Sequence, residues 1–343
     1  KGFLDSHQIV ELARRIGADA IHPGYGFLSE NAQFAELCDA SGITFIGPSP
    51  LAITTMGNKV KARELASKIG VPIVPGTDGG VTDVKEGIAF AKQAGYPVII
   101  KASAGGGGRG LRVVRSDAEI RENMEVAARE ALASFGDGSL FIEKYIERPH
   151  HIEFQILADR HGNIIHLGER DCSIQRRHQK LIEIAPSLVL TPKLRTEMGK
   201  AATAIARAVN YDNAGTVEFL LDQEGRFYFI EMNPRLQVEH TVTEQITAID
   251  IVRNQISIAA GKPLDIQQKD VILQGHAIQC RINAEDPKNN FMPCTGTVTD
   301  YLSPGGIGVR IDGAVYKDYT VPPYYDALLA QLTAGGRTRE DNA

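Results

Sequence analysis

Glu218 and Glu231 each lie inside a short apolar segment of the chain, TVEFL and FIEMN respectively. A turn around Gly225 separates the segments, so we expect an antiparallel hairpin with both carboxylates on one face. With Asn233 they offer the oxygen ligands that hold magnesium while nucleotide phosphates complete its shell. The alternative, two solvated strand carboxylates, is disfavoured by the Phe, Leu and Ile neighbours. The pattern therefore predicts a site for magnesium and phosphate.

A cation, an amide and a carboxylate follow directly in the segment Asn233–His240, which reads NPRLQVEH. An anion held by Arg235 and deprotonated by Glu239 would be placed to attack a γ-phosphate. His240 can equally be a capping or packing histidine, and we assign it no role. This segment is therefore predicted to hold the nucleophile of a phosphoryl transfer.

Four consecutive glycines lie in the segment Ala104–Gly110. Their backbone N–H groups can approach a phosphate closely because no Cβ intervenes. A P-loop is excluded, since no G-K-[ST] follows and the next element is a strand. The missing helix also argues against a dinucleotide-binding oxidoreductase. Lys101 and Lys59 are candidates for phosphate binding; the alternatives are a hairpin tip without a ligand and, for Lys59, a solvated helix lysine.

The composition excludes several classes of protein. The 343 residues carry a formal net charge of -5, and the basic run Gln175–Lys180 has no interleaved aromatic residues, so nucleic acid is not expected as a partner. Four cysteines without C-x-x-C spacing favour a reduced, cytoplasmic location. No apolar run approaches the roughly 18 residues of a membrane span, so no membrane association is expected. The length allows two or three domains.

Periodicity predicts the elements that position these residues. Alternating helix and strand up to residue 46 indicates βα layers with a parallel sheet, led by an amphipathic helix with apolar residues Ile9, Leu12, Ala13 and Ile16. Ser116 and Glu119 predict a capping box. Helices are expected at 32–40, 59–68, 84–94, 117–134, 192–209 and 242–260. Strands are expected at 20–22, 44–46, 96–101 and 111–114, antiparallel hairpins at 151–169 and 216–232, and further strands after residue 276.

Five segments, in this order and spacing, together resemble the biotin carboxylases, ATP-grasp enzymes found as subunits or domains of acetyl-CoA, propionyl-CoA and pyruvate carboxylases. They are His22–Asn31, the glycine run, Glu169–Lys180, Glu231–His240 and Cys280–Pro287. The resemblance covers essentially the whole chain and implies an ATP-grasp fold of mixed α/β and α+β type. It implies a truncated Rossmann-like N-terminal domain at 1–57, an ATP-grasp domain at 58–263 with a mobile glycine-rich lid at 75–145, and a truncated strand-rich C-terminal domain at 264–343.

The resemblance also implies a reaction. Bicarbonate, deprotonated by Glu239, attacks ATP to give ADP and carboxyphosphate; this breaks down to carbon dioxide and phosphate, and the phosphate takes the ureido proton of biotin. The closing lid keeps carboxyphosphate from water. Arg281 would steady the biotin enolate, and carboxybiotin is the product.

The roles implied by the resemblance fall on residues of this sequence as follows. The catalytic residues would be Lys180, Arg235, Glu239 and Arg281. ATP would contact Lys59, Lys101, Gly107, Gly108, Glu143, Lys144, Ile146, His151, Gln175, His178, Glu218 and Glu231. Magnesium or manganese would bind Glu218, Glu231 and Asn233. Bicarbonate would contact Lys180, Arg235, Gln237 and Val238, and biotin would contact Tyr25, Gly26 and Arg281.

Expected partners are a biotin carboxyl carrier protein or domain, a carboxyltransferase and a second copy in an intact homodimer. The location would be mitochondrial in a eukaryotic parent. The family's first strand and its last elements have no counterpart here, so we expect a truncated chain with reduced stability and impaired activity. Two alternatives are a carbamoyl-phosphate synthetase-type ligase and a non-catalytic nucleotide-binding module. The presence of Lys180, Arg235 and Glu239 argues against the module, and the Arg281 segment argues against the other ligase.

Overall fold

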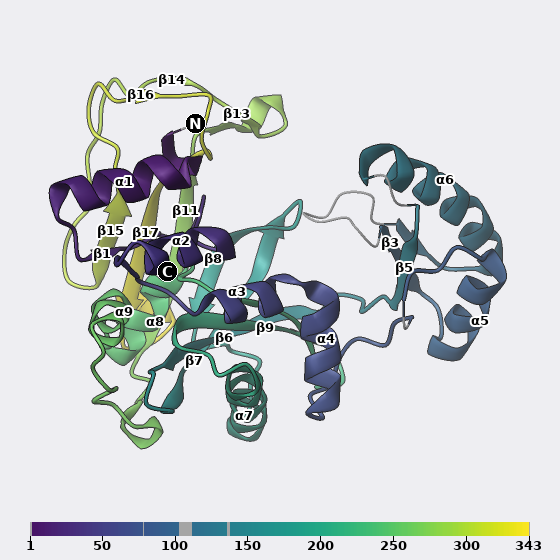
Figure 1. Cartoon of the computed structure of the whole chain (residues 1–343). Coiled ribbons are helices and arrows are strands. Elements are labelled where there is room, and N and C mark those ends of the chain that lie inside the picture. The colour runs from purple at the N-terminus through teal and green to yellow at the C-terminus, as the bar shows by residue number, and fades with distance from the viewer. Residues whose placement is uncertain (1, 78, 103–111, 136–137, 343) are drawn as a thin grey trace. The chain divides into compact units, whose positions relative to one another are not determined.

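The structure, a computed structural model, describes residues 2–77, 79–102, 112–135 and 138–342 (Figure 1). Gly107 and Gly108 lie outside these residues. The chain forms two compact units. Unit 1 comprises Lys1–Val71, His150–Phe219 and Glu231–Ala343, and unit 2 comprises Pro72–Pro149 and Leu220–Ile230.

An eight-stranded sheet dominates unit 1. Its strands, in spatial order, are β10 (Phe227–Asn233), β9 (Asn213–Leu221), β6 (His150–Ala158), β7 (Ile164–Arg176), β8 (Gln179–Ala185), β11 (His276–Asn283), β17 (Leu328–Gly336) and β15 (Val309–Gly313). Every pairing from β6 to β15 is antiparallel. The outer ends of β9 and β10 belong to unit 2. The expected hairpin of β6 with β7 and the pairing of β9 with β10 are both confirmed.

Local sequence explains the turn between β9 and β10. The Asp222 carboxylate accepts hydrogen bonds from the backbone N–H groups of Glu224 and Arg226. Gly225 has φ +80°, a left-handed conformation that favours glycine. These local interactions favour the turn that joins the two strands.

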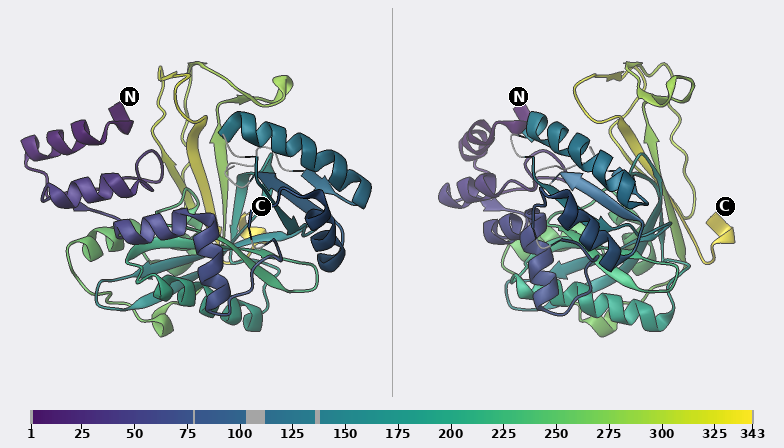
Figure 2. Two further views of the ribbon diagram at one scale, coloured as in Figure 1. Left: turned by 45° about the vertical axis from the view of Figure 1, so that its right-hand side comes forward. Right: turned by 90° about the vertical axis from the view of Figure 1, so that its right-hand side faces the viewer.

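Helix α7 (Pro192–Ala208) packs against β6 and β7 (Figure 2). The Thr191 hydroxyl accepts a hydrogen bond from the backbone N–H of Leu194, and proline occupies the first helical position, where no N–H is needed. The apolar residues Met198, Ala202 and Ile205 are buried. The helix predicted at 192–209 is confirmed, and it covers the face of the hairpin on which it packs.

The helix predicted at 242–260 is wrong as a single element. The structure has two helices, α8 (His240–Thr247) and α9 (Ile251–Ala259). Ala248 takes a left-handed conformation with φ +56° and ends α8, and the Asp250 carboxylate accepts from the N–H of Arg253 to begin α9. The Asp250 cap was the available sequence signal for this break. Because of this break, the helix that begins directly after Glu239 is the short helix α8.

The βα layers at the start of the chain are confirmed. They are α1 (Ser6–Ile16), β1 (Ala20–Ile21), α2 (Ala32–Ala40), β2 (Thr44–Phe45), α3 (Pro50–Gly57) and α4 (Lys59–Lys68), with β1 parallel to β2. Helix α3 was not predicted. In α1, Val10 and Ala13 are buried, whereas Leu12 and Ile16 are 53% and 70% exposed, so the expected apolar face is only partly buried.

Unit 2 contains a three-stranded antiparallel sheet with two helices. The sheet order is β4 (Arg112–Val114), β3 (Val98–Ala102) and β5 (Leu140–Lys144), and the helices are α5 (Val84–Ala94) and α6 (Asp117–Phe135). Apolar residues of both layers, among them Ile100, Met124 and Ile142, form one buried core. The Glu119 N–H donates to Ser116 Oγ as predicted, but the Glu119 carboxylate accepts from the Ser116 hydroxyl and the N–H of Arg115, not from the N–H of Ser116.

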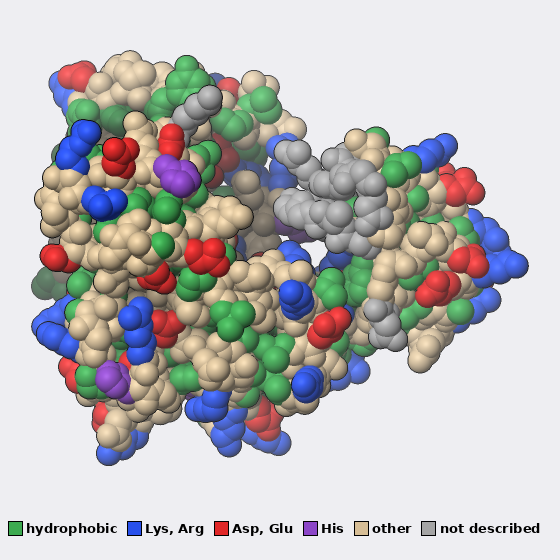
Figure 3. Space-filling view, viewed as in Figure 1, with side chains coloured by type: hydrophobic (Ala, Val, Ile, Leu, Met, Phe, Trp, Pro, Cys, Tyr) green, Lys and Arg blue, Asp and Glu red, His purple; other side chains and the backbone are tan. Residues whose placement is uncertain are grey.

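The last part of unit 1 is strand-rich, as predicted. Short strands β12 (Glu285–Asp286) and β13 (Met292–Pro293) pair with each other, as do β14 (Gly296–Thr297) and β16 (Thr320–Val321). Acidic and basic side chains are interspersed over the face shown in Figure 3, which agrees with the near-balanced charge. Across the described ranges, no helix combines the length and apolar character that crossing a membrane requires.

Candidate active site

Four neighbouring strands of the unit 1 sheet place charged residues close together. Glu153 lies on β6, Arg170 on β7, Lys180 and Glu183 on β8, and Glu218 on β9. The side chains of Glu153, Arg170 and Glu183 are fully buried, and that of Lys180 is only 14% exposed. Buried charges are costly unless they are paired and hydrogen-bonded. The contacts below show that each of them has partners.

Lys180 lies at the centre of this group. Three carboxylates accept hydrogen bonds from its ammonium group: Glu153, Glu218 at 2.9 Å and Glu239 at 2.7 Å. Burial lowers the pKa of Lys180, but these three carboxylates outweigh burial and raise it well above its usual value. The side chain is therefore a fixed cation that does not exchange its proton near neutral pH.

Arg281, on β11, is a second fixed cation. Its Nε donates to Glu183 at 2.7 Å and its Nη2 donates to Glu239 at 3.0 Å. Burial raises the pKa of Glu239, but Lys180, Arg281 and Arg170 outweigh it and lower the pKa to about 2. Burial dominates at Glu183 and raises its pKa to about 7 despite the neighbouring Arg281. Glu239 is thus an ionised carboxylate held between two cations.

Glu218 is enclosed by four hydrogen-bond donors. Its Oε2 lies 2.6 Å from His151 Nε2, and its Oε1 accepts from Lys180, Gln237 and Asn233 at 2.8 to 2.9 Å. Burial lowers the pKa of His151, but Glu218 outweighs this and raises it. Burial raises the pKa of Glu218, but Lys180 and His151 lower it to well below its usual value. A cation that bound Glu218 would displace one of these donors.

The predicted metal ligands are partly brought together. Asn233 contacts Glu218 through its amide nitrogen, and its Oδ1 accepts from Arg235 at 3.1 Å. Glu231 forms an ion pair of 3.0 Å with Lys59. Two carboxylates and an amide oxygen are hard donors of the kind that magnesium takes, so this donor set fits the metal. A different group whose ligand atoms lie within 4.8 Å of one another is His151, Glu153 and Glu218.

The predicted bicarbonate residues come from one segment and one strand. Gln237 is buried, Val238 is partly exposed, and both lie just before Glu239. Arg235 Nε lies 3.4 Å from the Glu30 carboxylate. The structure therefore joins Gln237 to Lys180 through Glu218 and joins Lys180 directly to Glu239. Arg235 is attached through Asn233.

The basic run Gln175–Lys180 spans the end of β7, the turn of the β7–β8 hairpin and the start of β8. Arg177 and His178 both have positive φ, 52° and 64°, and form the tip. Arg176 pairs with Glu285. Gln175 Nε2 lies 3.0 Å from His151 Nδ1, which brings two predicted nucleotide residues into contact. The tip thus directs Lys180 into the buried cluster.

Other predicted nucleotide residues lie in unit 2. Lys101 on β3 pairs with Glu143 on the adjacent strand β5. The Lys144 ammonium donates to the backbone carbonyls of Gly95 and Tyr96, both at 2.9 Å. Ile146 follows β5. Within unit 2, Lys101, which is predicted to bind phosphate, is therefore paired with Glu143 of the segment that is predicted to bind adenine.

The predicted biotin residues Tyr25 and Gly26 lie in the loop between β1 and α2. Tyr25 is 40% exposed. The neighbouring Phe27 has φ 52° and stacks against Phe3 with a centroid distance of 5.3 Å. Arg281, the third predicted residue, is fixed in the buried cluster by Glu183 and Glu239.

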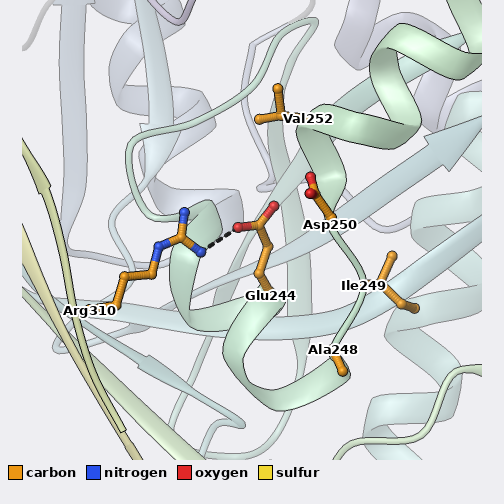
Figure 4. Close-up of a pocket in the computed structure, with 6 residues that line it drawn as sticks. All are labelled: Glu244, Ala248, Ile249, Asp250, Val252 and Arg310. Atoms are coloured by element: carbon orange, nitrogen blue, oxygen red, sulfur yellow. Dashed lines mark hydrogen bonds and ion pairs between the residues drawn. The ribbon is translucent and has the colours of Figure 1, made fainter. Parts of the chain in front are cut away.

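A second charged cluster in unit 1 lines a cavity of about 490 Å³ (Figure 4). Arg310 on β15 donates to Glu244 on α8 at 2.5 Å and to Asp312 at 2.6 and 2.9 Å. Its side chain is 35% exposed. Hydrogen bonds donated to Asp312 raise the pKa of Arg310 further above its usual value. We predict a structural or interface role for Arg310, outside the catalytic set.

Three buried charged residues of the cluster were missed from the sequence: Glu153, Arg170 and Glu183. Each is a charged residue within a strand, and from sequence alone such a residue has the same local pattern as a solvated strand position. The available signal was their apolar surroundings, as in HIEFQIL around Glu153 and LIEIA around Glu183. The same argument had identified Glu218.

Three protein families match consecutive parts of the chain. They are described as the biotin carboxylase N-terminal domain, over residues 1–53, the ATP binding domain of the carbamoyl-phosphate synthase L chain, over residues 58–267, and the biotin carboxylase C-terminal domain, over residues 279–343. The order of the matches agrees with the resemblance inferred from the motifs.

Similar proteins include a biotin carboxylase from Nostoc sp., 57% identical over 99% of this chain and 76% of the relative. The 2-oxoglutarate carboxylase small subunit of Hydrogenobacter thermophilus is 56% identical over 96% of this chain and 70% of its own length. The solved biotin carboxylase domain dimer of that carboxylase, in complex with MgADP, ADP and bicarbonate, has a TM-score of 0.90 at 55% identity, covering 98% of this chain and 74% of its own. The chain therefore belongs to the biotin carboxylase family of ATP-grasp ligases.

Proposed function

We propose that the buried cluster around Lys180 is where this chain carries out the reaction of its family, the ATP-dependent carboxylation of biotin by bicarbonate. The products are carboxybiotin, ADP and phosphate. One observation carries the proposal: the Glu239 carboxylate lies between two buried cations, 2.7 Å from Lys180 and 3.0 Å from Arg281. A buried base held between cations suits an anionic substrate that must be bound and deprotonated.

Bicarbonate would bind at Lys180, Arg235, Gln237 and Val238. A carboxylate with a pKa of about 2 is a weak base, and it has this pKa because Lys180 and Arg281 donate to it. Hydrogen bonds from these cations to the bound anion would weaken their hold on Glu239 and raise its basicity. The substrate would thereby activate the residue that takes its proton, and the proton would move to a Glu239 oxygen as bicarbonate attacks the γ-phosphate.

The nucleotide would be held by cations and by the hairpin tip. Lys59, Lys101, Gly107 and Gly108 would contact phosphates, and Glu143, Lys144 and Ile146 would contact the adenine. His151, Gln175 and His178 would line the pocket. Glu218, Glu231 and Asn233 would hold magnesium or manganese, which neutralises charge on the phosphates when it is bound. Lys59 already pairs with Glu231, so binding of the metal would release its ammonium for phosphate.

Biotin would be placed by Tyr25, Gly26 and Arg281. Arg281 would stabilise the negative charge that develops on the ureido oxygen when the ring loses its proton. In the folded chain this guanidinium is already oriented by Glu183 and Glu239, so little reorganisation is needed. The same arginine would thus serve both the deprotonation of bicarbonate and the acceptance of carbon dioxide by biotin.

The biotin would be presented by a carrier protein or domain and passed to a carboxyltransferase. The similar Hydrogenobacter protein is named a small subunit, and its solved domain is a dimer, which supports a multi-component assembly and a homodimer. We also propose functional domains at 1–57, 58–263 and 264–343, with 75–145 as the lid.

An assay with free biotin tests the proposal. The chain is incubated with magnesium, ATP and labelled bicarbonate, and ADP and acid-labile labelled product are measured with and without biotin. Biotin should stimulate ADP release and yield labelled carboxybiotin. ADP release that depends on ammonia instead would favour the carbamoyl-phosphate synthetase type. Binding of ATP without any bicarbonate-dependent turnover would contradict the proposal and favour a non-catalytic module.

A further inference from the structure

Arg170 on β7 is a fully buried arginine to which nothing above assigns a role. A guanidinium has five N–H donors in a fixed plane, and each must find an acceptor when it is buried. In this structure each of the five N–H groups of Arg170 has an acceptor. The acceptors are Glu153 at 2.5 Å, Gln155 at 2.8 Å, Thr243 at 2.9 Å, Thr216 at 3.1 Å and Gln237 at 2.9 Å.

These acceptors come from separate parts of unit 1. Glu153 and Gln155 lie on β6, Thr216 lies on β9, and Thr243 lies on α8. Gln237 lies in the irregular segment between β10 and α8. A single planar group therefore fixes two strands, a helix and the segment that carries the predicted bicarbonate residues.

Two of the five acceptors also contact the buried group of charged residues around Lys180, which we call the Lys180 cluster. Glu153 accepts from Arg170 through one oxygen and from Lys180 through the other. Gln237 accepts from Arg170 through Oε1, which leaves its Nε2 to donate to Glu218 at 2.8 Å. Arg170 thereby fixes the orientation of the Gln237 amide and one of the three carboxylates that hold Lys180.

We propose that Arg170 is a positioning residue for bicarbonate: it holds Gln237 and, through Glu153, Lys180 in the arrangement that binds the anion. This inference rests on the proposed function of the Lys180 cluster. Arg170 is buried behind these residues and acts only through them, since its five donors are used within the protein. Lysine cannot replace it, because one ammonium group with three donors cannot reach five acceptors spread around a plane.

The test compares Arg170→Lys with the wild type and with Arg195→Lys. Arg195 is a matched control, because it makes three hydrogen bonds of 2.7 to 2.9 Å to Glu169, the residue next to Arg170, and none of them involves the Lys180 cluster. Bicarbonate affinity is measured without turnover, by ¹³C NMR titration of labelled bicarbonate against protein saturated with MgADP. The KM for ATP and the melting temperature are measured alongside.

We expect Arg170→Lys to weaken bicarbonate binding about 30-fold, as for the loss of two charge-assisted hydrogen bonds, with the KM for ATP within about 2-fold of wild type. Arg195→Lys should lower the melting temperature and leave both constants within about 2-fold. Equal weakening of bicarbonate and ATP, or the same change in both variants, would overturn the inference.

Thr216→Val keeps the inference testable if Arg170→Lys does not fold. It removes one acceptor of the Nη2 group that also holds Gln237, and it should weaken bicarbonate binding about 5-fold; no change would count against the inference. A wild type that binds bicarbonate but never carboxylates biotin would refute the proposed function alone. A wild type that binds no bicarbonate would refute both.

Discussion

Unit 1 contains two clusters in which a cation lies between carboxylates, and they differ in burial. In the Lys180 cluster the cation contacts Glu153, Glu218 and Glu239, all of them buried. In the Arg310 cluster the cation contacts Glu244 (Figure 4). It also contacts Asp312, and its side chain remains 35% exposed. The hydrogen-bond lengths are similar, so distance alone does not separate them.

The difference shows that burial decides what an ion pair can do. Charges in a low-dielectric interior interact strongly and are costly to leave unpaired, whereas partly exposed pairs are screened by water. Three cations hold the pKa of Glu239 well below its usual value against the effect of burial, and burial holds the pKa of Glu183 above its usual value. A cluster with this property can bind an anion and move a proton, while the Arg310 cluster is expected to add only stability.

Replacing Lys180 with methionine should give the largest effect. It leaves three buried carboxylates without their common cation, which costs about 3–5 kcal/mol of unfolding free energy at pH 8. Since the uncompensated carboxylates take up protons more readily, the loss should be smaller at pH 5 than at pH 8. Chemical denaturation at both pH values measures this. A loss below 1 kcal/mol at pH 8 would mean that the cluster is solvated and the comparison is wrong.

Replacing Glu183 with glutamine should change how stability depends on pH. The folded pKa is about 7 against an ordinary value of 4.5. Between these values the folded state holds more protons than the unfolded state, so the free energy of unfolding falls as pH rises from 4.5 to 7 and then levels off. The wild type should lose about 2–3 kcal/mol over this window relative to Glu183→Gln. Parallel curves for the two proteins would show that Glu183 is ionised throughout.

Replacing Arg310 with methionine should give the smallest effect. A half-exposed ion pair contributes about 1 kcal/mol or less, so denaturation should show a loss of that size at pH 7. The loss should shrink further at high salt, because screening already weakens the exposed pair. The KM for bicarbonate should stay within about 2-fold of wild type. A loss as large as that of Lys180→Met would remove the distinction between the clusters.

Sequence reasoning predicted the elements well wherever their boundaries carry local chemistry. Thr191 and Pro192 mark the start of α7, and the glycine turns mark the β6–β7 and β9–β10 hairpins. The break between α8 and α9 was missed because the left-handed Ala248 has no residue-type signal and the Asp250 cap was not weighed. Leu12 and Ile16 were expected to be buried from periodicity alone, which shows a pattern but not what covers it.

Only some of the residues of the candidate site could be identified from the sequence. Lys180 and Arg281 were found through the family resemblance, whereas the segment Asn233–His240 had already indicated Glu239 as a base. Their contacts to Glu153, Arg170 and Glu183 depend on strand order, since β8 pairs with β11, almost a hundred residues further along the chain. No local pattern reports such a pairing. The pKa values of Glu183 and Glu239, which arise from these contacts, could not be predicted either.

The Glu239→Gln variant provides the most direct test of the central claim, that the buried carboxylate between Lys180 and Arg281 takes the proton of bicarbonate. Glutamine keeps the size of the side chain and an oxygen acceptor but cannot act as a base. The measurement is the rate of labelled carboxybiotin formation from free biotin, with melting temperature as a check on folding. We predict a fall of about 10²–10⁴-fold in kcat with the fold retained. A folded Glu239→Gln protein that carboxylates biotin at the wild-type rate would contradict the account.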